Sequence, residues 1–192
     1  PSGVFVRLVI ESGAIVAGRG GDGGNGGGWF GSFGGDGGDG LLIQSAITID
    51  NQSIITGGGG GGGGGSSSLV FDIGLGDYYA QAGGGGGGGG WPYGSGGLGY
   101  DTTYAPHNGQ NGQNAPSSVG TALGGAGYKP TPFIQAYDGG NSGSTYASDG
   151  LDSENAAGSG GAYSDKGTAG DAIHGQSFIV WENIGTIYGA TS

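Results

Sequence analysis

Long runs of glycine are the feature that most constrains how this chain can fold. Glycine occupies 57 of 192 positions, and the stretches 57–65 and 83–90 contain nothing else. Collagen requires a strict Gly-X-Y repeat with abundant proline, whereas this chain has six prolines and no such repeat. Flexible linkers, the other common use of glycine, need no regular spacing. Here the spacing is regular, which favours an ordered structure.

The residues between the glycines recur at every third position in two segments: Arg19, Asp22 and Asn25, then Phe33, Asp36 and Asp39. Three residues per turn is the period of a polyproline II type helix, which makes no internal hydrogen bonds. Its buried N–H and C=O groups must therefore bond to neighbouring rods, and only glycine lets the backbones approach closely enough. A rod with an Asp or Asn edge is expected at the surface, with that edge in water.

The predicted fold class is therefore all-β or irregular, a layered polyglycine II bundle with almost no α-helix. We expect about eight to ten rods of this kind. The glycines predicted to lie on shared edges are Gly20, Gly21, Gly23, Gly24, Gly57, Gly61, Gly65, Gly83, Gly87 and Gly90.

Three segments rich in β-branched and aromatic residues, each with a central turn, predict β-hairpins at 4–17, 46–56 and 177–188. Each meets a glycine segment at one end, so the hairpins are expected together at one end of the bundle. The whole chain, 1–192, is interpreted as a single domain. Because it opens at Pro1 without an initiator Met, it is expected to be processed or cut from something longer.

The loops between the rods have a different composition, with Tyr, Ser, Gly and Asn together, as in antibody combining loops. If the rods alternate in direction, 29–33, 66–82 and 100–119 share the far end, opposite the hairpins. Loop 144–157 joins them only if 139–143 forms a rod. The aromatics could instead cap rod ends and form a small apolar core. The residues predicted to bind a receptor are Trp29, Phe30, Phe33, Tyr78, Tyr79, Tyr100, Tyr104 and His107.

Charge and motifs exclude several functions. Four Lys and Arg against 15 Asp and Glu give a net charge of −11, which argues against binding nucleic acid or anionic lipid, including phosphate-rich lipopolysaccharide without bridging divalent cations. No apolar run is long enough to insert in a membrane. Without cysteine or a catalytic motif, neither an enzyme nor a cofactor is expected.

The segment 34–42 fits one calcium β-roll repeat, but a single copy does not predict a metal site. His174 is expected to hydrogen-bond Asp171, one turn away on its rod.

A hairpin that leads into GRGGDGGNGG, polyglycine alternating with Tyr-rich loops, and a closing hairpin that ends in YGATS resemble bacteriophage tail adhesins. The chain is most similar to the receptor-binding tips of T-even-like long tail fibres and to the ends of some siphophage host-specificity proteins. The resemblance covers nearly all of the chain, but because the chain starts directly at a predicted strand, the separate N-terminal fibre-attachment domain of the T-even adhesins is not expected within it. It implies a location in the virion at the tail fibre or tail tip. It also implies two partners, an outer-membrane protein of a Gram-negative host and the rest of the tail.

Two other functions stay open at this point. Some arthropod antifreeze proteins resemble polyglycine II bundles too, but with strict Gly-X-X repeats, short turns and disulfides. An extracellular glycine-rich structural protein would show repetitive rather than unique aromatic loops. The long loops and the absence of cysteine favour the adhesin over both.

Overall fold

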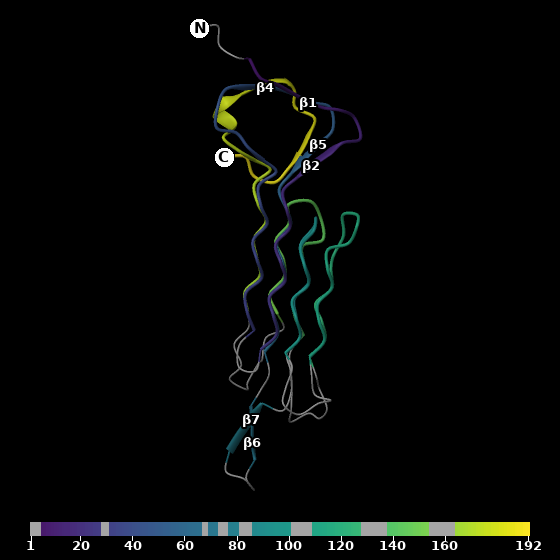
Figure 1. Cartoon of the computed structure of the whole chain (residues 1–192), viewed down its shortest axis with the longest axis vertical. Helices are drawn as coiled ribbons and strands as arrows, with labels where there is room; N and C mark the ends of the chain where they lie inside the picture. Colours follow the sequence, from purple (N-terminus) through teal and green to yellow (C-terminus); the bar gives the residue numbers. More distant parts are fainter. Residues whose placement is uncertain are drawn as a thin grey trace.

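The computed structural model describes residues 5–27, 31–66, 86–100, 109–127, 138–153 and 164–192, and the backbone of 69–72 and 77–80. A small β cap sits at one end, extended glycine-rich rods run from it, and a two-stranded hairpin lies at the opposite end (Figure 1). In the described part, the helical structure is one 3-10 turn, η1 (Gln176–Phe178). The all-β, irregular fold class is therefore confirmed.

The cap consists of three strand–turn–strand arches, not of three hairpins. The first strands of the arches are β1 (Arg7–Ile10), β4 (Ile47–Asn51) and β9 (Ile179–Asn183), and they pair in parallel in the order β1-β4-β9. The second strands are β2 (Ile15–Ala17), β5 (Ile54–Thr56) and β10 (Thr186–Tyr188), and they form a second parallel sheet, β10-β5-β2.

The predicted hairpins at 4–17, 46–56 and 177–188 are therefore wrong in their pairing, although each of the three segments does contain two strands separated by a turn. The two arms of each segment belong to different sheets, because each arm bonds to the equivalent arm of a neighbouring arch. A turn flanked by two apolar runs is compatible with both arrangements. Stacking the arches lets their inner faces enclose an apolar core, which an isolated hairpin could not do.

That core is small. Its buried members are Ile10, Ile55, Ala172 and Ile173, surrounded by partly buried side chains such as Trp181. The junction with the rods is closed by the parallel pair β3 (Leu41–Leu42) and β8 (Ile173–His174). Outside the core, an ionic network joins the three first strands, since Arg7 on β1 contacts Asp50 on β4 and Glu182 on β9, at 2.9 and 2.6 Å.

The rods carry no helix or strand, yet they run side by side and exchange backbone hydrogen bonds at every third residue. Gly18, Gly21, Gly24 and Gly27, for example, donate in turn to the carbonyls of Thr56, Gly59, Gly62 and Gly65. This three-residue repeat supports the polyglycine II interpretation, which stays a prediction about the backbone angles.

The described residues include ten rods: 1 (18–27), 2 (31–40), 3 (57–66), 4 (86–90), 5 (94–100), 6 (109–115), 7 (122–127), 8 (138–143), 9 (148–153) and 10 (164–172).

The hydrogen-bond partners arrange these rods in three layers. Rods 2, 1 and 5 form one outer layer, rods 10, 3, 4 and 6 the middle layer, and rods 9, 8 and 7 the other outer layer. Rods 1 and 3 are parallel, whereas rod 2 is antiparallel to both: residues 32, 35 and 38 donate to 25, 22 and 19. Odd-numbered rods run away from the cap and even-numbered rods return to it.

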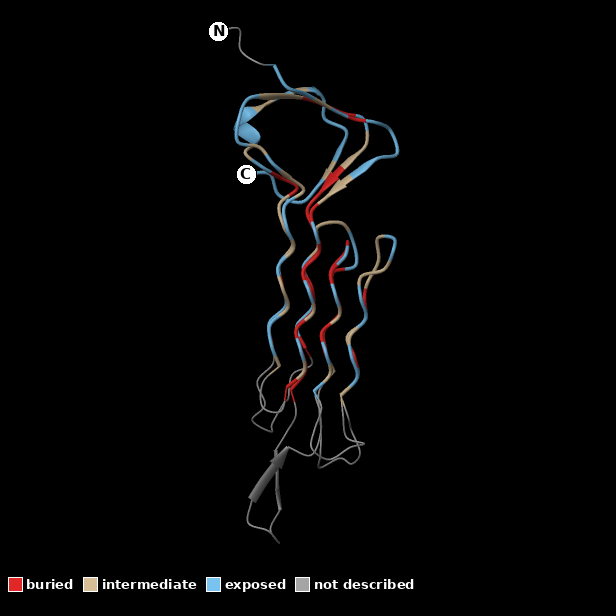
Figure 2. Ribbon diagram, viewed as in Figure 1, coloured by how far each residue is buried: buried red, intermediate tan, exposed pale blue. Residues whose placement is uncertain are grey.

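Rods 3 and 4 form the centre of the bundle. Rod 3 donates to rods 2, 4 and 9 and accepts from rods 1, 8 and 10, so six neighbours surround it. Rod 4 has the same arrangement with rods 1, 6 and 8 as acceptors and rods 3, 5 and 7 as donors. Figure 2 shows buried residues along the inner rods and where they enter the cap. Nearly every backbone polar group of rod 3 is paired in this way, as burial requires.

Close approach explains the glycines. A Cβ on Gly61 would lie 2.2 Å from the carbonyl oxygen of Asp22, and one on Gly87 would lie 2.0 Å from that of Gly62. The same conflict with a backbone carbonyl is found at Gly20, Gly21, Gly23, Gly24, Gly57 and Gly90. Gly65 accepts a hydrogen bond from Gly27, and Gly83 lies outside the described residues.

Two rods lie where loops were expected. Segment 109–115 falls within the predicted loop 100–119, and segment 148–153 falls within the predicted loop 144–157. Among the described residues, rod 6 exchanges backbone hydrogen bonds with rods 4, 5 and 7 alone, so it needs glycine mainly on its inward edge, as at Gly112, where a Cβ would meet the carbonyl oxygen of Gly87. Most of its other positions carry Gln or Asn, so the segment does not look like a glycine rod in the sequence. The segment 139–143, ambiguous in the sequence, belongs to rod 8.

Replacing Gly61 by Ala is expected to destabilise the protein strongly, because the new methyl group would overlap backbone that cannot move alone. The loss should exceed the roughly 1–3 kcal/mol typical of overpacked cores. Gly38→Ala is the matched control, since its Cβ would meet nothing nearer than 3.5 Å. Chemical denaturation of both variants checks the prediction. Equal stability of the two would contradict the close packing of rod 3.

Candidate functional site

The alternation of the rods collects many chain connections at one end of the bundle, here called the far end. Odd-numbered rods finish there, at Gly27, Ser66, Tyr100, Gly127 and Ser153. Three of these ends are bonded to a neighbouring rod there: Gly27 N–H to Gly65, Ser153 N–H to Ser164, and the Tyr100 carbonyl to Gly109, at 3.0, 3.2 and 3.1 Å. The five connections that leave this end are therefore attached to one continuous platform.

The connections themselves, 28–30, 67–85, 101–108, 128–137 and 154–163, lie outside the described residues except for two strands. These are β6 (Leu69–Asp72) and β7 (Asp77–Ala80), which pair antiparallel, with Leu69 opposite Ala80. They form a hairpin at the far end (Figure 1). Sequence reasoning had placed this segment in a loop, although its β-branched and aromatic residues were a signal for strands.

The predicted receptor-binding residues can be placed in part. Phe33 at the start of rod 2 and Tyr100 at the end of rod 5 lie at the far end, with exposed fractions of 68% and 37%. Tyr78 and Tyr79 belong to β7, opposite Phe71 and Val70. Trp29, Phe30, Tyr104 and His107 lie outside the described residues.

Three other aromatic residues lie at the cap end of the bundle instead. Trp91, Tyr146 and Tyr188 form a cluster beside the cap, with an edge-to-face contact of 5.3 Å between ring centroids and a stacked contact of 4.9 Å. Tyr146 lies in the turn 144–147 between rods 8 and 9, at the cap end. For these three residues the structural interpretation of the aromatics, as caps on rod ends, is correct.

The Asp and Asn edges of the surface rods are predicted to face water. In the structure they also accept hydrogen bonds from neighbouring rods. Rod 5 shows the reason: its inner N–H groups at 94 and 97 bond to rod 4, but its other N–H groups have no backbone acceptor among the described residues. Side chains of the adjacent rods accept instead. Asp22 and Asn25 bind the N–H groups of Ser95 and Leu98, and Asn114 and Asn111 bind those of Gly96 and Gly99, all at 2.8 Å.

The same ladder occurs around the bundle. Oδ1 of Asp36 accepts from the N–H and the hydroxyl of Thr168, at 2.8 and 2.9 Å, and Oδ1 of Asp39 accepts from the N–H of Asp171 at 3.0 Å. The segment 34–42, considered as a calcium repeat, thus uses these oxygens for rod pairing. The described residues contain no group of three or more possible metal ligands.

Asp171 and His174, expected to bond directly, are instead linked by Ser192. The Ser192 hydroxyl lies 2.7 Å from Oδ2 of Asp171 and 3.1 Å from Nδ1 of His174. The serine hydroxyl, rather than the imidazole, contacts the carboxylate. This order differs from a catalytic triad, in which the histidine lies between the other two.

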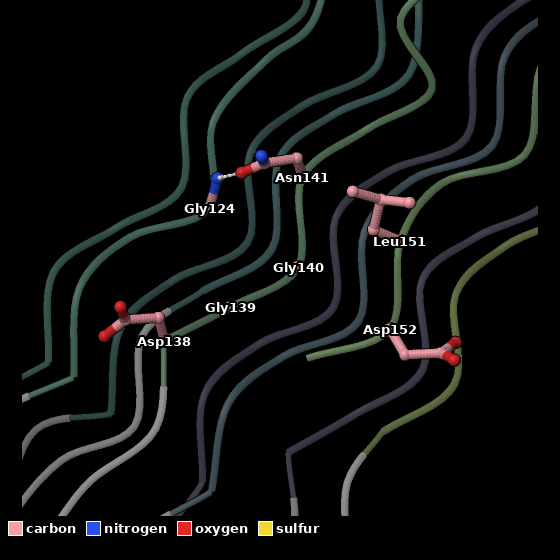
Figure 3. A pocket seen from close by; sticks show the side chains of 7 residues that line it. All are labelled: Gly124, Asp138, Gly139, Gly140, Asn141, Leu151 and Asp152. Carbon is pink, nitrogen blue, oxygen red and sulfur yellow. Dashed lines mark hydrogen bonds between the residues drawn. The ribbon is translucent and has the colours of Figure 1, made fainter. Parts of the chain in front are cut away.

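One hollow of about 310 Å³ lies on the outer surface of rod 8 (Figure 3). Gly139 and Gly140 are at its centre, with Gly124 on rod 7 and Leu151 on rod 9 beside them. The carboxylates of Asp138 and Asp152 point to opposite sides of rod 8 in Figure 3. The hollow therefore has no convergent pair of acids of the kind that general acid–base chemistry requires.

Hydrogen bonds to the carboxylates alter their ionisation. The N–H of Ser95 holds the pKa of Asp22 below its ordinary value, and Arg19 acts in the same direction. The N–H of Thr168 lowers the pKa of Asp36. In the cap, the amide of Asn183 is the main cause that lowers the pKa of Asp50, with Gln52 and Arg7 adding to it.

Two comparisons with known proteins agree on what kind of protein this is. The chain matches the family described as "Phage tail fibre adhesin Gp38" over residues 1–192, and it therefore belongs to this family. Among solved structures it is similar to a chain of the gp37-gp38 adhesin tip complex of the bacteriophage S16 long tail fiber, with 30% sequence identity and a TM-score of 0.50. That match covers 98% of this chain and 59% of the other, so this chain spans little more than half of its relative. No curated protein matches.

Membership confirms the predicted resemblance and places the protein in the tail fibre of a phage particle. The family is one of adhesins rather than enzymes, and the ice-binding and structural alternatives are not favoured. In the described part of the chain, no helix has the length and apolar character needed to cross a membrane.

The lowered pKa values predict acid sensitivity. Folding favours the carboxylate form of Asp22, Asp36 and Asp50, so their stabilisation is complete above the unfolded-state pKa, near 3.9, and is lost as the pH falls through the lower folded values. We expect a constant thermal midpoint from about pH 8 to pH 5 and a decline below about pH 4.

Two variants of Asp36 separate the charge from the hydrogen bond. Asp36→Asn keeps Oδ1 for Thr168 and should stay near wild type at pH 7, with a shallower acid decline. Asp36→Ala should lower the midpoint at every pH, because the N–H of Thr168 loses its acceptor. Thermal unfolding between pH 2 and pH 8 measures both effects. An unchanged acid decline in Asp36→Asn would show that Asp36 contributes nothing to it.

Proposed function

We propose that this protein binds a host outer-membrane protein through the far end of its rod bundle, while its cap faces the rest of the tail fibre. The observation that carries this proposal is topological. In the described part of the chain, ten alternating rods gather five connections on one platform, opposite the cap and the C-terminus (Figure 1). A division into a fibre-facing end and a host-facing end is what an adhesin at a fibre tip needs.

The rigidity of the platform supports the recognition role. The far-end connections begin and end in rods that are hydrogen-bonded to their neighbours up to the last described residues, such as Gly27 and Ser153. The rods thus hold the points from which the connections leave, and preorganisation of this kind lowers the entropic cost of binding. Phe33 and Tyr100 add exposed aromatic surface at the same end, and aromatic residues are common anchors of protein interfaces.

The chemistry of the partner follows from charge. With a net charge of −11, the protein is repelled by bare phosphate and attracted by basic side chains over a screening length of about 8 Å at physiological ionic strength. A protein loop that exposes Lys or Arg is therefore the preferred target. Binding is reversible and involves no chemical reaction.

The cap has a surface suited to the fibre. Phe5 and Val180 are 98% and 64% exposed, and they lie on the same outer sheet side as the Arg7 ionic network. Exposed apolar side chains next to an ion pair are typical of a protein interface. The solved relative is described as part of a complex between gp37 and gp38, which supports association of this family with another fibre subunit.

The far end can be tested by replacing segments 101–108 and 69–82 with short Gly-Ser turns, which leaves the rods intact. We expect loss of binding to host cells, because the recognition surface is removed. Cell binding of the wild type should also disappear in one strain of a panel in which each strain lacks one outer-membrane protein. Flow cytometry with labelled protein measures both.

The turn 116–119, at the cap end between rods 6 and 7, supplies the control. The same Gly-Ser replacement there should leave cell binding unchanged. If the far-end variant unfolds at the wild-type temperature and still binds cells, recognition lies elsewhere on the molecule.

The cap can be tested with Val180→Glu, which places a charge on the outer sheet without touching the buried core. It should reduce co-purification with the preceding fibre subunit and leave cell binding intact. Leu151→Glu, an equally exposed leucine on rod 9, is the control. Equal co-purification of both variants with the subunit would refute the assignment of the cap.

A further inference from the structure

The surface charge of the bundle is strongly segregated. Rods 2 and 9, which both lie beside rod 10, form with it what we call the acidic flank. Its described residues carry six aspartates and one lysine: Asp36, Asp39, Asp149, Asp152, Asp165, Asp171 and Lys166. Rods 5, 6 and 7 lie at the opposite edge of the layers and form the amide flank. Their described residues, 94–100, 109–115 and 122–127, include no Asp, Glu, Lys or Arg.

The two flanks share one hydrogen-bond geometry. On the acidic flank, Asp36 and Asp39 use Oδ1 to bind N–H groups of rod 10. On the amide flank, Asn111 and Asn114 use Oδ1 to bind N–H groups of rod 5, both at 2.8 Å. In each pair the two side chains are one three-residue turn apart, about 9 Å at 3.1 Å per residue. Asp and Asn therefore play the same structural part, so the difference in charge is not needed to build the rods.

What differs is the group left for a ligand. Because each backbone N–H holds the amide oxygen, the NH2 groups of Asn111 and Asn114 face away from rod 5, and both residues are exposed. Gln113 is fixed in the same way by the N–H of Leu123, at 3.2 Å. The amide flank therefore offers oriented donors on both sides of rod 6, toward rod 5 and toward rod 7, whereas the carboxylates of the acidic flank can only accept.

Apolar groups lie among these donors. Leu98, Leu123 and Tyr100 are exposed on the rods of the amide flank, and Tyr100 stands at the far end. The N–H of Leu98 is held by Asn25, so its position on rod 5 is set by the same ladder. Oriented donors, apolar side chains and an aromatic ring, without a net charge, match the hydroxyl oxygens and C–H faces of sugar rings.

We propose that the amide flank is a second contact surface, which binds the oligosaccharide of the host outer membrane while the far end binds the protein receptor. The proposal rests on the proposed function and adds a saccharide to its partners. The argument from net charge against lipopolysaccharide then applies to one flank only. While the far end engages the receptor protein, repulsion between the acidic flank and the phosphates of the membrane surface makes the amide flank the side that contacts the surrounding oligosaccharide.

The test exchanges the two chemistries without changing the ladder. In Asn111→Asp/Asn114→Asp the Oδ1 acceptors remain, but the donors become carboxylate oxygens. Asp36→Asn/Asp39→Asn is the matched control, with the reverse change on the other flank. The probe is the purified core oligosaccharide of the host, immobilised for biolayer interferometry, and thermal unfolding verifies that both variants are folded.

We expect the amide-flank variant to bind the oligosaccharide at least about tenfold more weakly, and the control to stay within about twofold of wild type. If the double variant does not fold, binding of the oligosaccharide is measured for Leu98→Glu instead. It should be weaker than for Leu98→Gln, which changes the same exposed position without adding a charge. No binding of the wild-type protein to the oligosaccharide, or equal binding of all the variants, would overturn the proposal.

Cell binding separates this proposal from the proposed function. Two isogenic host strains are needed, one with the core oligosaccharide and one without it, both with the receptor protein. The amide-flank variant should bind more weakly than wild type to the first strain and equally to the second. An equal loss on both strains would mean that the flank contacts protein and would overturn the saccharide assignment. The replacement of 101–108 and 69–82, by contrast, should abolish binding to both strains.

Discussion

Hydrogen bonds between backbones that have no Cβ between them are the interaction on which the rest of this structure depends. In rod 3 each glycine N–H from 57 to 64 donates to another segment, and a methyl group at most of these positions would overlap a carbonyl. Glycine loses much conformational freedom on folding, and the apolar core of four buried residues is too small to offset this by itself. A nearly complete set of backbone hydrogen bonds in a water-excluding bundle provides the missing stabilisation.

The boundary of the bundle follows from the same constraint. A rod at the surface lacks neighbours, so some of its N–H groups have no backbone acceptor, and oxygens of Asp, Asn, Gln and Ser side chains take that place. Because Asp and Asn offer the same oxygen, the structure tolerates either residue at these positions. The two flanks can therefore differ in charge while they share one scaffold.

The direction of the rods links the scaffold to function. Alternation sends five connections to the far end and leaves short turns, such as 91–93 and 144–147, beside the cap. Variation in the far-end segments would not disturb the hydrogen bonds of the rods. An adhesin benefits from such a separation, since binding residues on connections vary more freely than those in a packed scaffold.

The sequence by itself determined the rods with the clearest repeat, the strands of the cap and the resemblance to tail adhesins. The three-residue spacing of Asp22 and Asn25 is local, and so is the need for glycine between them. Only the tertiary structure decided how the arches pair, because an arm such as β4 bonds equally well to its own partner across the turn or to β1. The rods that leave each arch set the spacing and select the parallel stack. The tertiary structure also revealed rod 6, since a rod at the edge needs few glycines. It revealed the role of Asn111 and Asn114 as well, because their side-chain oxygens accept from N–H groups of rod 5, 12 and 18 residues away along the chain.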